Sequence, residues 1–102
     1  MELVRQPIIS ATEEGVEKCC RMIADKMKTL GIKTEIHSVK PYPVITGRVG
    51  TDPYKKTVLI YAHYDVMPEG DLKLWETPPF KPSVRNSKLY GRGSADNKSP
   101  LI

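Results

Sequence analysis

The 102-residue sequence has little cysteine and no long apolar stretch. Its two cysteines, Cys19 and Cys20, are adjacent in an expected helix, where neighbouring residues are badly placed for a normal disulfide. We therefore predict reduced thiols in a core, which is typical of a cytoplasmic protein. No apolar run approaches the roughly 20 residues that cross a bilayer, and the N-terminus lacks the charged-then-apolar pattern of a signal peptide. We accordingly expect no membrane association.

Blocks of like charge and internal repeats are also absent from the sequence. The chain carries 16 Lys and Arg residues against 12 Asp and Glu residues, which gives a formal net charge of +4. The lysines are scattered along it, for example at Lys26, Lys28, Lys40, Lys73 and Lys88. Scattered lysines are typical of a solvated surface, so we expect no nucleic-acid partner.

The first long element that the sequence predicts is a helix over residues 11–30. Ser10 and Glu13 offer a capping box at its start, and Gly31 can close its end. Apolar residues recur at steps of three and four along it: Val16, Cys20, Ile23, Met27 and Leu30. This spacing predicts one apolar helix face that packs against a sheet.

Three strands are predicted after this helix. Residues 33–39 alternate in polarity, and residues 44–49 form a second run beyond two prolines. Residues 57–62 are continuously apolar and β-branched, which favours a strand buried on both faces. The order of helix and strands predicts an α/β fold with a mixed sheet, one face of which is covered by the N-terminal helix.

The apolar run ends in His63-Tyr64-Asp65, a pattern with the chemistry of a metal site. Ligands gather at the carboxyl ends of strands in open α/β sheets. Because side chains alternate with a period of two, His63 and Asp65 point to the same side while the chain stays extended. A metal-binding imidazole usually donates its other N–H to a carboxylate, and Asp65 is close enough to accept it. From these residues alone, a His and an Asp that simply end a strand in solvent remain an alternative.

A second segment, residues 89–98, reads Leu-Tyr-Gly-Arg-Gly-Ser-Ala-Asp-Asn-Lys, and Trp75 and Pro79-Phe80 lie between it and His63. Together, these three separated motifs resemble the co-catalytic zinc metallopeptidases, which include cytosolic dipeptidases, carnosine dipeptidase, aminoacylases and acetylornithine deacetylase. The resemblance covers nearly the whole chain and implies a partial zinc-exopeptidase-like catalytic domain. Ser99 departs from it, because the family usually has glycine after the lysine.

The resemblance implies a role for each matched residue. His63 would ligate one zinc ion, Asp65 would have the catalytic role of orienting His63, and Asp96 would bridge two zinc ions; Mn²⁺ or Co²⁺ could replace zinc. A bridging carboxylate has a physical reason, since two cations about 3.5–4 Å apart repel each other and need shared negative charge. In the family the peptide bond after this aspartate tends to be cis, and Asn97 follows it here. Substrate-binding residues stay unassigned.

We expect residues 1–102 to form the N-terminal portion of a metallopeptidase catalytic domain, incomplete at the C-terminal end and also at the N-terminal end. Ser99-Pro100 is a helix-start signal two residues before the sequence stops. Residues 2–10 resemble the tail of the family's first helix and the link after it. The family's adjacent glutamate pair and remaining ligands follow the bridging aspartate, whereas the adjacent pair here, Glu13-Glu14, precedes it.

The resulting functional expectation is a zinc-dependent hydrolase of peptide or amide bonds, of the dipeptidase or carboxypeptidase type, that is inactive as this chain alone. Its substrate would be a small peptide or an N-acyl amino acid, and full-length relatives would be homodimeric where they carry the family's dimerisation domain. The alternative is a non-catalytic truncated relative that serves as an interaction or regulatory piece.

Further residues leave alternatives open. Residues 93–99 superficially resemble a phosphate-binding loop that ends in Lys98-Ser99, but the glycine directly before the lysine is missing. His37 matches no ligand motif, so we expect a structural role for it. Trp75 is either an aromatic anchor or a substrate-lining residue. Arg92 either pairs with a carboxylate near the site or caps the turn.

Overall fold

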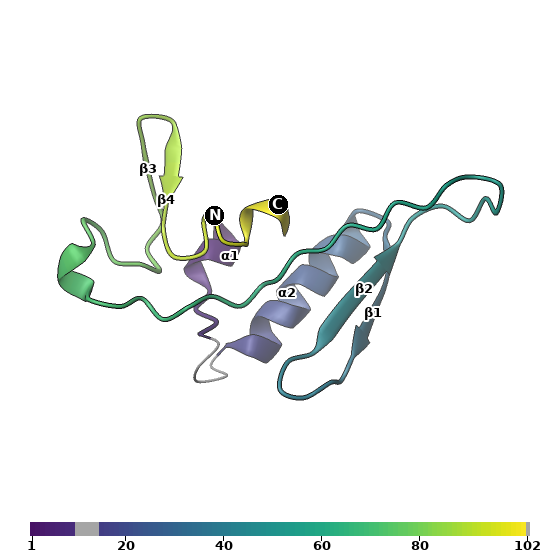
Figure 1. Ribbon diagram of the computed structural model, residues 1–102, viewed down its shortest axis with the longest axis horizontal. Helices are drawn as coiled ribbons and strands as arrows, with labels where there is room; N and C mark the ends of the chain where they lie inside the picture. Colours follow the sequence, from purple (N-terminus) through teal and green to yellow (C-terminus); the bar gives the residue numbers. More distant parts are fainter. Residues whose placement is uncertain (10–14, 102) are drawn as a thin grey trace.

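The computed structural model describes residues 1–9 and 15–101. Its elements in chain order are α1 (Glu2–Arg5), α2 (Val16–Thr29), β1 (Lys33–His37), β2 (Val44–Arg48), the 3₁₀ turn η1 (Leu72–Leu74), β3 (Ser83–Arg85), β4 (Lys88–Tyr90) and the 3₁₀ turn η2 (Ser99–Leu101). β1 pairs with β2, and β3 pairs with β4, as two antiparallel sheets. Figure 1 shows the β1–β2 hairpin beside α2 and the β3–β4 hairpin apart from both.

The long helix α2 supplies most of the core. It follows Gly15, whose left-handed backbone (φ 74°) ends the preceding link, and the predicted capping box of Ser10 and Glu13 lies outside the described residues. Its buried residues are Val16, Cys19, Cys20, Ile23 and Ala24. The predicted apolar face is therefore confirmed at its start. The prediction is wrong at Leu30, which is 67% exposed because it lies beyond the last turn of the helix.

β1 and β2 pack on α2 through a close approach at Gly47. A Cβ atom on Gly47 would lie 2.2 Å from Met27 Cε and 2.7 Å from Ile32 Cγ2. A larger residue here would require the terminal methyl of Met27 and the side chain of Ile32 to shift. The register, in which Ile36 faces Ile45, agrees with the two strands that the sequence predicts at these positions.

The prediction of a buried strand over residues 57–62 is wrong. These residues are extended, but no strand pairs with them among the described residues. Val58, Leu59, Ile60 and Tyr61 are 81%, 91%, 82% and 83% exposed. Burial of an apolar run needs neighbouring strands, and the described residues provide none for this one.

The N-terminal segment, which we define as residues 2–9, pairs with the chain at Val66. Ile9 and Val66 form a parallel bridge, and the backbone N–H of Val66 donates to the carbonyl of Ile8 over 2.9 Å. Parallel pairing in the described residues is confined to this bridge, beside the two antiparallel hairpins. Figure 1 shows α1 next to the C-terminal turn η2, so the two ends of the described chain are neighbours.

None of the described helices combines the length and the apolar character that crossing a bilayer requires. The predicted helix start at Ser99-Pro100 is present as η2. Cys19 and Cys20 are both buried, which confirms their predicted place in the core. Burial raises the pKa of the Cys19 thiol to about 11, against an opposing effect of the charge of Lys98.

This pKa predicts slow alkylation of Cys19 in the folded protein. The thiolate is the reactive form, and a raised pKa makes it scarce at pH 8, so the alkylation rate should rise only as the pH approaches 11. Iodoacetamide labelling followed by peptide mass spectrometry measures this rate. The same chain in denaturant is the control, and equally fast labelling of folded and denatured protein at pH 8 would refute the prediction.

Candidate metal centre

The structure brings His63, Asp65 and Asp96 together, although Asp96 lies 33 residues after His63. His63 Nε2 is 3.1 Å from Asp96 Oδ1. On the other side of the ring, Nδ1 is 3.1 Å from the backbone carbonyl of Asp65 and 3.3 Å from its Oδ1. The imidazole therefore lies between two carboxylates, and each carboxylate faces a different nitrogen.

The environment of His63 favours its charged form in the metal-free protein. Burial alone lowers the pKa of the imidazole, but the hydrogen bonds to Asp65 and Asp96 and the negative charges of both outweigh it and leave the pKa above its ordinary value. The side chains of His63 and Asp65 are about one third exposed, whereas that of Asp96 is 82% exposed. The Asp96 side of the ring is thus the side open to solvent and to an incoming ion.

Asp96 is presented by a tight turn over residues 93–98. Gly93 has a positive φ of 80°, and the N–H of Lys98 donates to its carbonyl over 2.9 Å. The peptide bond between Asp96 and Asn97 is cis, as the family resemblance implies. The backbone N–H of His63 donates to Asn97 Oδ1 over 3.4 Å, a contact between the two motifs that the sequence analysis missed.

Lys98 has a different environment from the one a phosphate-binding loop requires. It is fully buried, and its Nζ donates to the carbonyls of Leu3 and Gln6 over 2.8 and 2.7 Å. An ammonium group bound in this way points away from any phosphate that the loop could hold. The structure therefore argues against the nucleotide-binding alternative.

Trp75 and Arg92 form a structural contact with each other. Trp75 Nε1 and Arg92 Nη2 both donate to the carbonyl of Glu69, over 2.9 and 3.1 Å, and the Arg92 guanidinium lies 5.1 Å from the Trp75 ring centroid. Arg92 thus stabilises the loop after Asp65 by a hydrogen bond to the backbone carbonyl of Glu69, and not by pairing with a carboxylate. His37 is exposed in β1 and bonded to Thr46 Oγ1 over 2.8 Å, in agreement with a structural role.

The chemistry of the donor atoms fits zinc. Zinc accepts imidazole nitrogen and carboxylate oxygen at about 2.0–2.2 Å, so two ligand atoms on one tetrahedral ion lie about 3.3 Å apart. His63 Nε2 and Asp96 Oδ1 are 3.1 Å apart, close to that separation. Within residues 1–9 and 15–101, however, no three His, Cys, Asp or Glu side chains form a group that could hold an ion. The described residues thus bring together one imidazole nitrogen and one carboxylate oxygen of the kinds that zinc accepts, with the carboxylate of Asp65 on the other side of the ring.

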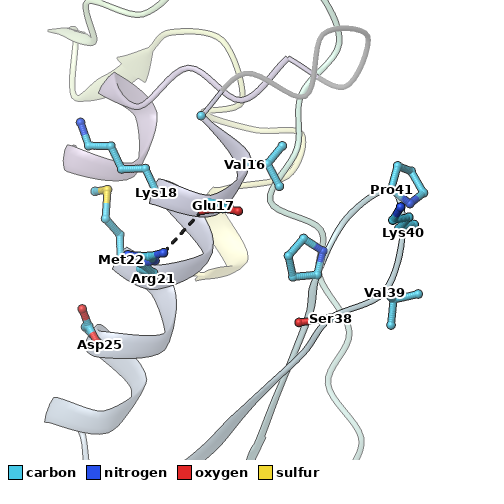
Figure 2. Close-up of a pocket in the computed structure, with 12 residues that line it drawn as sticks. Val16, Glu17, Lys18, Arg21, Met22, Asp25, Ser38, Val39, Lys40 and Pro41 are labelled. Atoms are coloured by element: carbon cyan, nitrogen blue, oxygen red, sulfur yellow. Dashed lines mark hydrogen bonds and ion pairs between the residues drawn. The ribbon is translucent and has the colours of Figure 1, made fainter.

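A cavity of about 960 Å³ lies elsewhere, between α2 and residues 38–43. Figure 2 shows Glu17, Lys18, Arg21 and Asp25 on its helix side and Val39 to Pro41 on the opposite loop. Arg21 is paired with Glu17 along the helix over 3.4 Å. His63, Asp65 and Asp96 do not line this cavity, so its size carries no information about the chemistry of the metal centre.

Comparison with known proteins agrees with this geometry. Residues 59–102 match the pattern of peptidase family M20/M25/M40. Over these residues the chain is similar to this family. It is 37% identical to the Cys-Gly metallodipeptidase of Candida albicans, over 94% of this chain and 24% of that protein. It is 38% identical to the succinyl-diaminopimelate desuccinylase of Blochmanniella floridana, over 98% of this chain and 26% of that protein.

The similarity to the M20/M25/M40 family extends to the structure. The crystal structure of an M20 family metallo-carboxypeptidase from Sulfolobus solfataricus matches with a TM-score of 0.90 and 36% identity, over 98% of this chain and 23% of that one. The predicted α/β fold of a zinc-exopeptidase-like domain is thus confirmed for the part that this chain covers. The chain spans about a quarter of the length of these curated relatives.

The position of the His63 ring between two carboxylates predicts a specific titration change. In the metal-free protein, Asp96→Asn removes a negative charge that favours the imidazolium form, so the pKa of His63 should fall. Nuclear magnetic resonance titration of the ring protons measures it, with exposed His37 as the internal control. Asp52→Asn, at an exposed carboxylate that pairs with Lys55 and accepts the backbone N–H of Tyr54, is the matched variant. An unchanged His63 pKa in Asp96→Asn would contradict the geometry.

Proposed function

We propose that this chain is part of a zinc-dependent hydrolase of peptide or amide bonds. The observation that carries the proposal is the separation of roles at His63, where Asp65 faces Nδ1 and Asp96 faces Nε2. A paired carboxylate on one nitrogen and a second, solvent-exposed carboxylate beside the other is the arrangement of a metal-binding histidine with its supporting group. The dipeptidase, desuccinylase and carboxypeptidase relatives support the same reaction class.

Each residue has a defined task in this proposal. His63 Nε2 and Asp96 would hold zinc, and Asp96 would be shared by a second zinc ion, with Mn²⁺ or Co²⁺ as substitutes. When bound, the metal supplies Lewis-acid activation of water and of the substrate carbonyl. Asp65 accepts the Nδ1 proton of His63, which leaves the lone pair of Nε2 for the metal and fixes the ring orientation. The Asn97 side chain keeps the His63 backbone beside the Asp96 turn.

The proposed substrates are small peptides or N-acyl amino acids. The relatives carry names with different substrates, Cys-Gly and succinyl-diaminopimelate, and both substrates contain an amide bond next to a small acidic or zwitterionic group. The free buried thiols at Cys19 and Cys20 support a reducing compartment such as the cytoplasm. We also propose a homodimer for proteins of this family that reach full length.

A non-catalytic interaction piece is the second candidate. The observation in its favour is that the described residues bring only His63 and Asp96 to the proposed ion, whereas a two-zinc centre needs about three protein ligands per metal. We therefore propose that residues 1–102 alone do not hydrolyse peptides. Both candidates retain the metal-binding role of His63, so hydrolysis by the native protein separates them.

The test compares two histidine variants of the native protein. His63→Ala should lower zinc-dependent hydrolysis of Cys-Gly or an N-succinyl amino acid by more than the ~10–100-fold typical of a lost outer-shell partner, because a ligand itself is removed. His37→Ala, at an exposed histidine, is the matched control and should leave the rate unchanged. Intact mass of the native protein accompanies the assay. A mass that matches 102 residues, with no hydrolysis, would favour the interaction piece; equal rates in both variants would refute the proposed site.

A further inference from the structure

Lys98 is the least expected buried residue of the structure. It is fully buried, although a buried lysine loses the hydration of its charge and is rare without compensation. This burial lowers the pKa of Lys98. No carboxylate within the described part of the chain pairs with it, and its partners are the carbonyl oxygens of Leu3 and Gln6.

These two carbonyls lie at the end of α1 (Glu2–Arg5). The last carbonyls of a helix lack partners within the helix and carry partial negative charge, which favours a cation beside them. Nζ of Lys98 reaches both over 2.8 and 2.7 Å, across 95 and 92 residues of sequence. The contact therefore compensates the buried ammonium group and fixes α1 to the turn that carries Asp96.

The N-terminal segment also contacts the chain next to His63 and Asp65. The carbonyl of Ile8 accepts the N–H of Val66, the residue directly after Asp65. Residues 3–8 thus contact both site segments, one through Val66 and the other through Lys98. The contacts lie within six residues of the N-terminal segment, residues 3–8, so they set how far apart the two site segments lie.

Side-chain packing joins the same parts. A Cβ atom on Gly93 would lie 2.7 Å from Val66 Cγ1 and 3.1 Å from Lys98 Cδ, so the turn packs directly against both side chains. The Lys98 stem is therefore enclosed between the turn and α1. A change in its length or charge would be transmitted to the backbone that positions Asp96, two residues earlier.

We propose that Lys98 is a positioning residue of the metal centre: by binding the end of α1 it fixes the turn of residues 93–98, so that Asp96 and His63 share one metal ion. This inference rests on the proposed function for the identity of the ion. It adds a role for the N-terminal segment, which contributes no ligand but completes the ligand geometry. Lys98 itself touches neither metal nor substrate.

The test measures zinc affinity of the full protein by competition with a chelating dye. Lys98→Met keeps the length of the stem and removes the ammonium group, and we expect zinc to bind about 10–100-fold more weakly, as for other lost partners behind a metal ligand. Lys88→Met, at an exposed lysine of β4, is the matched control and should not change the affinity. An unchanged zinc affinity in folded Lys98→Met protein would overturn the proposal.

Two further variants separate positioning from general destabilisation. Ile45→Ala weakens core packing on α2 away from the site, and should lower the melting temperature without loss of zinc affinity. Removal of residues 1–6 deletes both carbonyl partners of Lys98, and should weaken zinc binding as much as Lys98→Met does, with little further loss when the two are combined. Fully additive losses, or an equal loss of affinity in Ile45→Ala, would overturn the positioning role.

The outcomes also distinguish this inference from the proposed function. Zinc binding that depends on both His63 and Lys98, without hydrolysis by the native protein, would refute the proposed reaction alone. Hydrolysis and zinc binding that depend on His63 but are unaffected by Lys98→Met would refute the positioning role alone. Zinc affinity that is independent of His63 would refute both.

Discussion

One buried ammonium group connects the two ends of the described chain. Lys98 Nζ donates to Leu3 and Gln6, and this contact holds α1 against the turn that presents Asp96. The core of α2 stabilises the β1–β2 hairpin and also receives Leu3, one of the two partners of Lys98, but it includes neither Asp65 nor Asp96. The candidate metal centre is therefore joined to the N-terminal segment by a few polar contacts over long sequence separations, next to an apolar core.

In the candidate metal centre, the two nitrogens of the His63 ring contact two different aspartates. Asp65 is close in sequence and approaches Nδ1 with both its carbonyl and its carboxylate. Asp96 is distant in sequence, mostly exposed, and approaches Nε2. In the proposed site, Asp65 would therefore orient the ring and Asp96 would be the second metal ligand. The contact between Asp65 and His63 depends on a short extended segment, whereas the contact between Asp96 and His63 depends on the tertiary structure.

Local features could be predicted from the sequence, whereas features that need distant partners could not. The His63 and Asp65 pair and the two strands of the first hairpin follow from short patterns, and the cis bond after Asp96 was implied by the family resemblance. The predicted burial of residues 57–62 is wrong, because an apolar run indicates only a preference for burial and no described strand pairs with this run. The contact between Lys98 and α1 could not be predicted, because no sequence pattern indicates that a lysine will bind carbonyls some 90 residues away.

The exposed, unpaired residues 57–62 favour association between copies of this chain in solution. Its backbone groups are unpaired within the described residues, and four neighbouring apolar side chains are exposed, which together form a template for intermolecular strand pairing. Lys55 and Lys56 immediately precede it and are both exposed. Charges of this kind act as gatekeepers against aggregation, and salt screens them. The colloidal stability of the chain therefore depends on ionic strength through two lysines at one end of six residues.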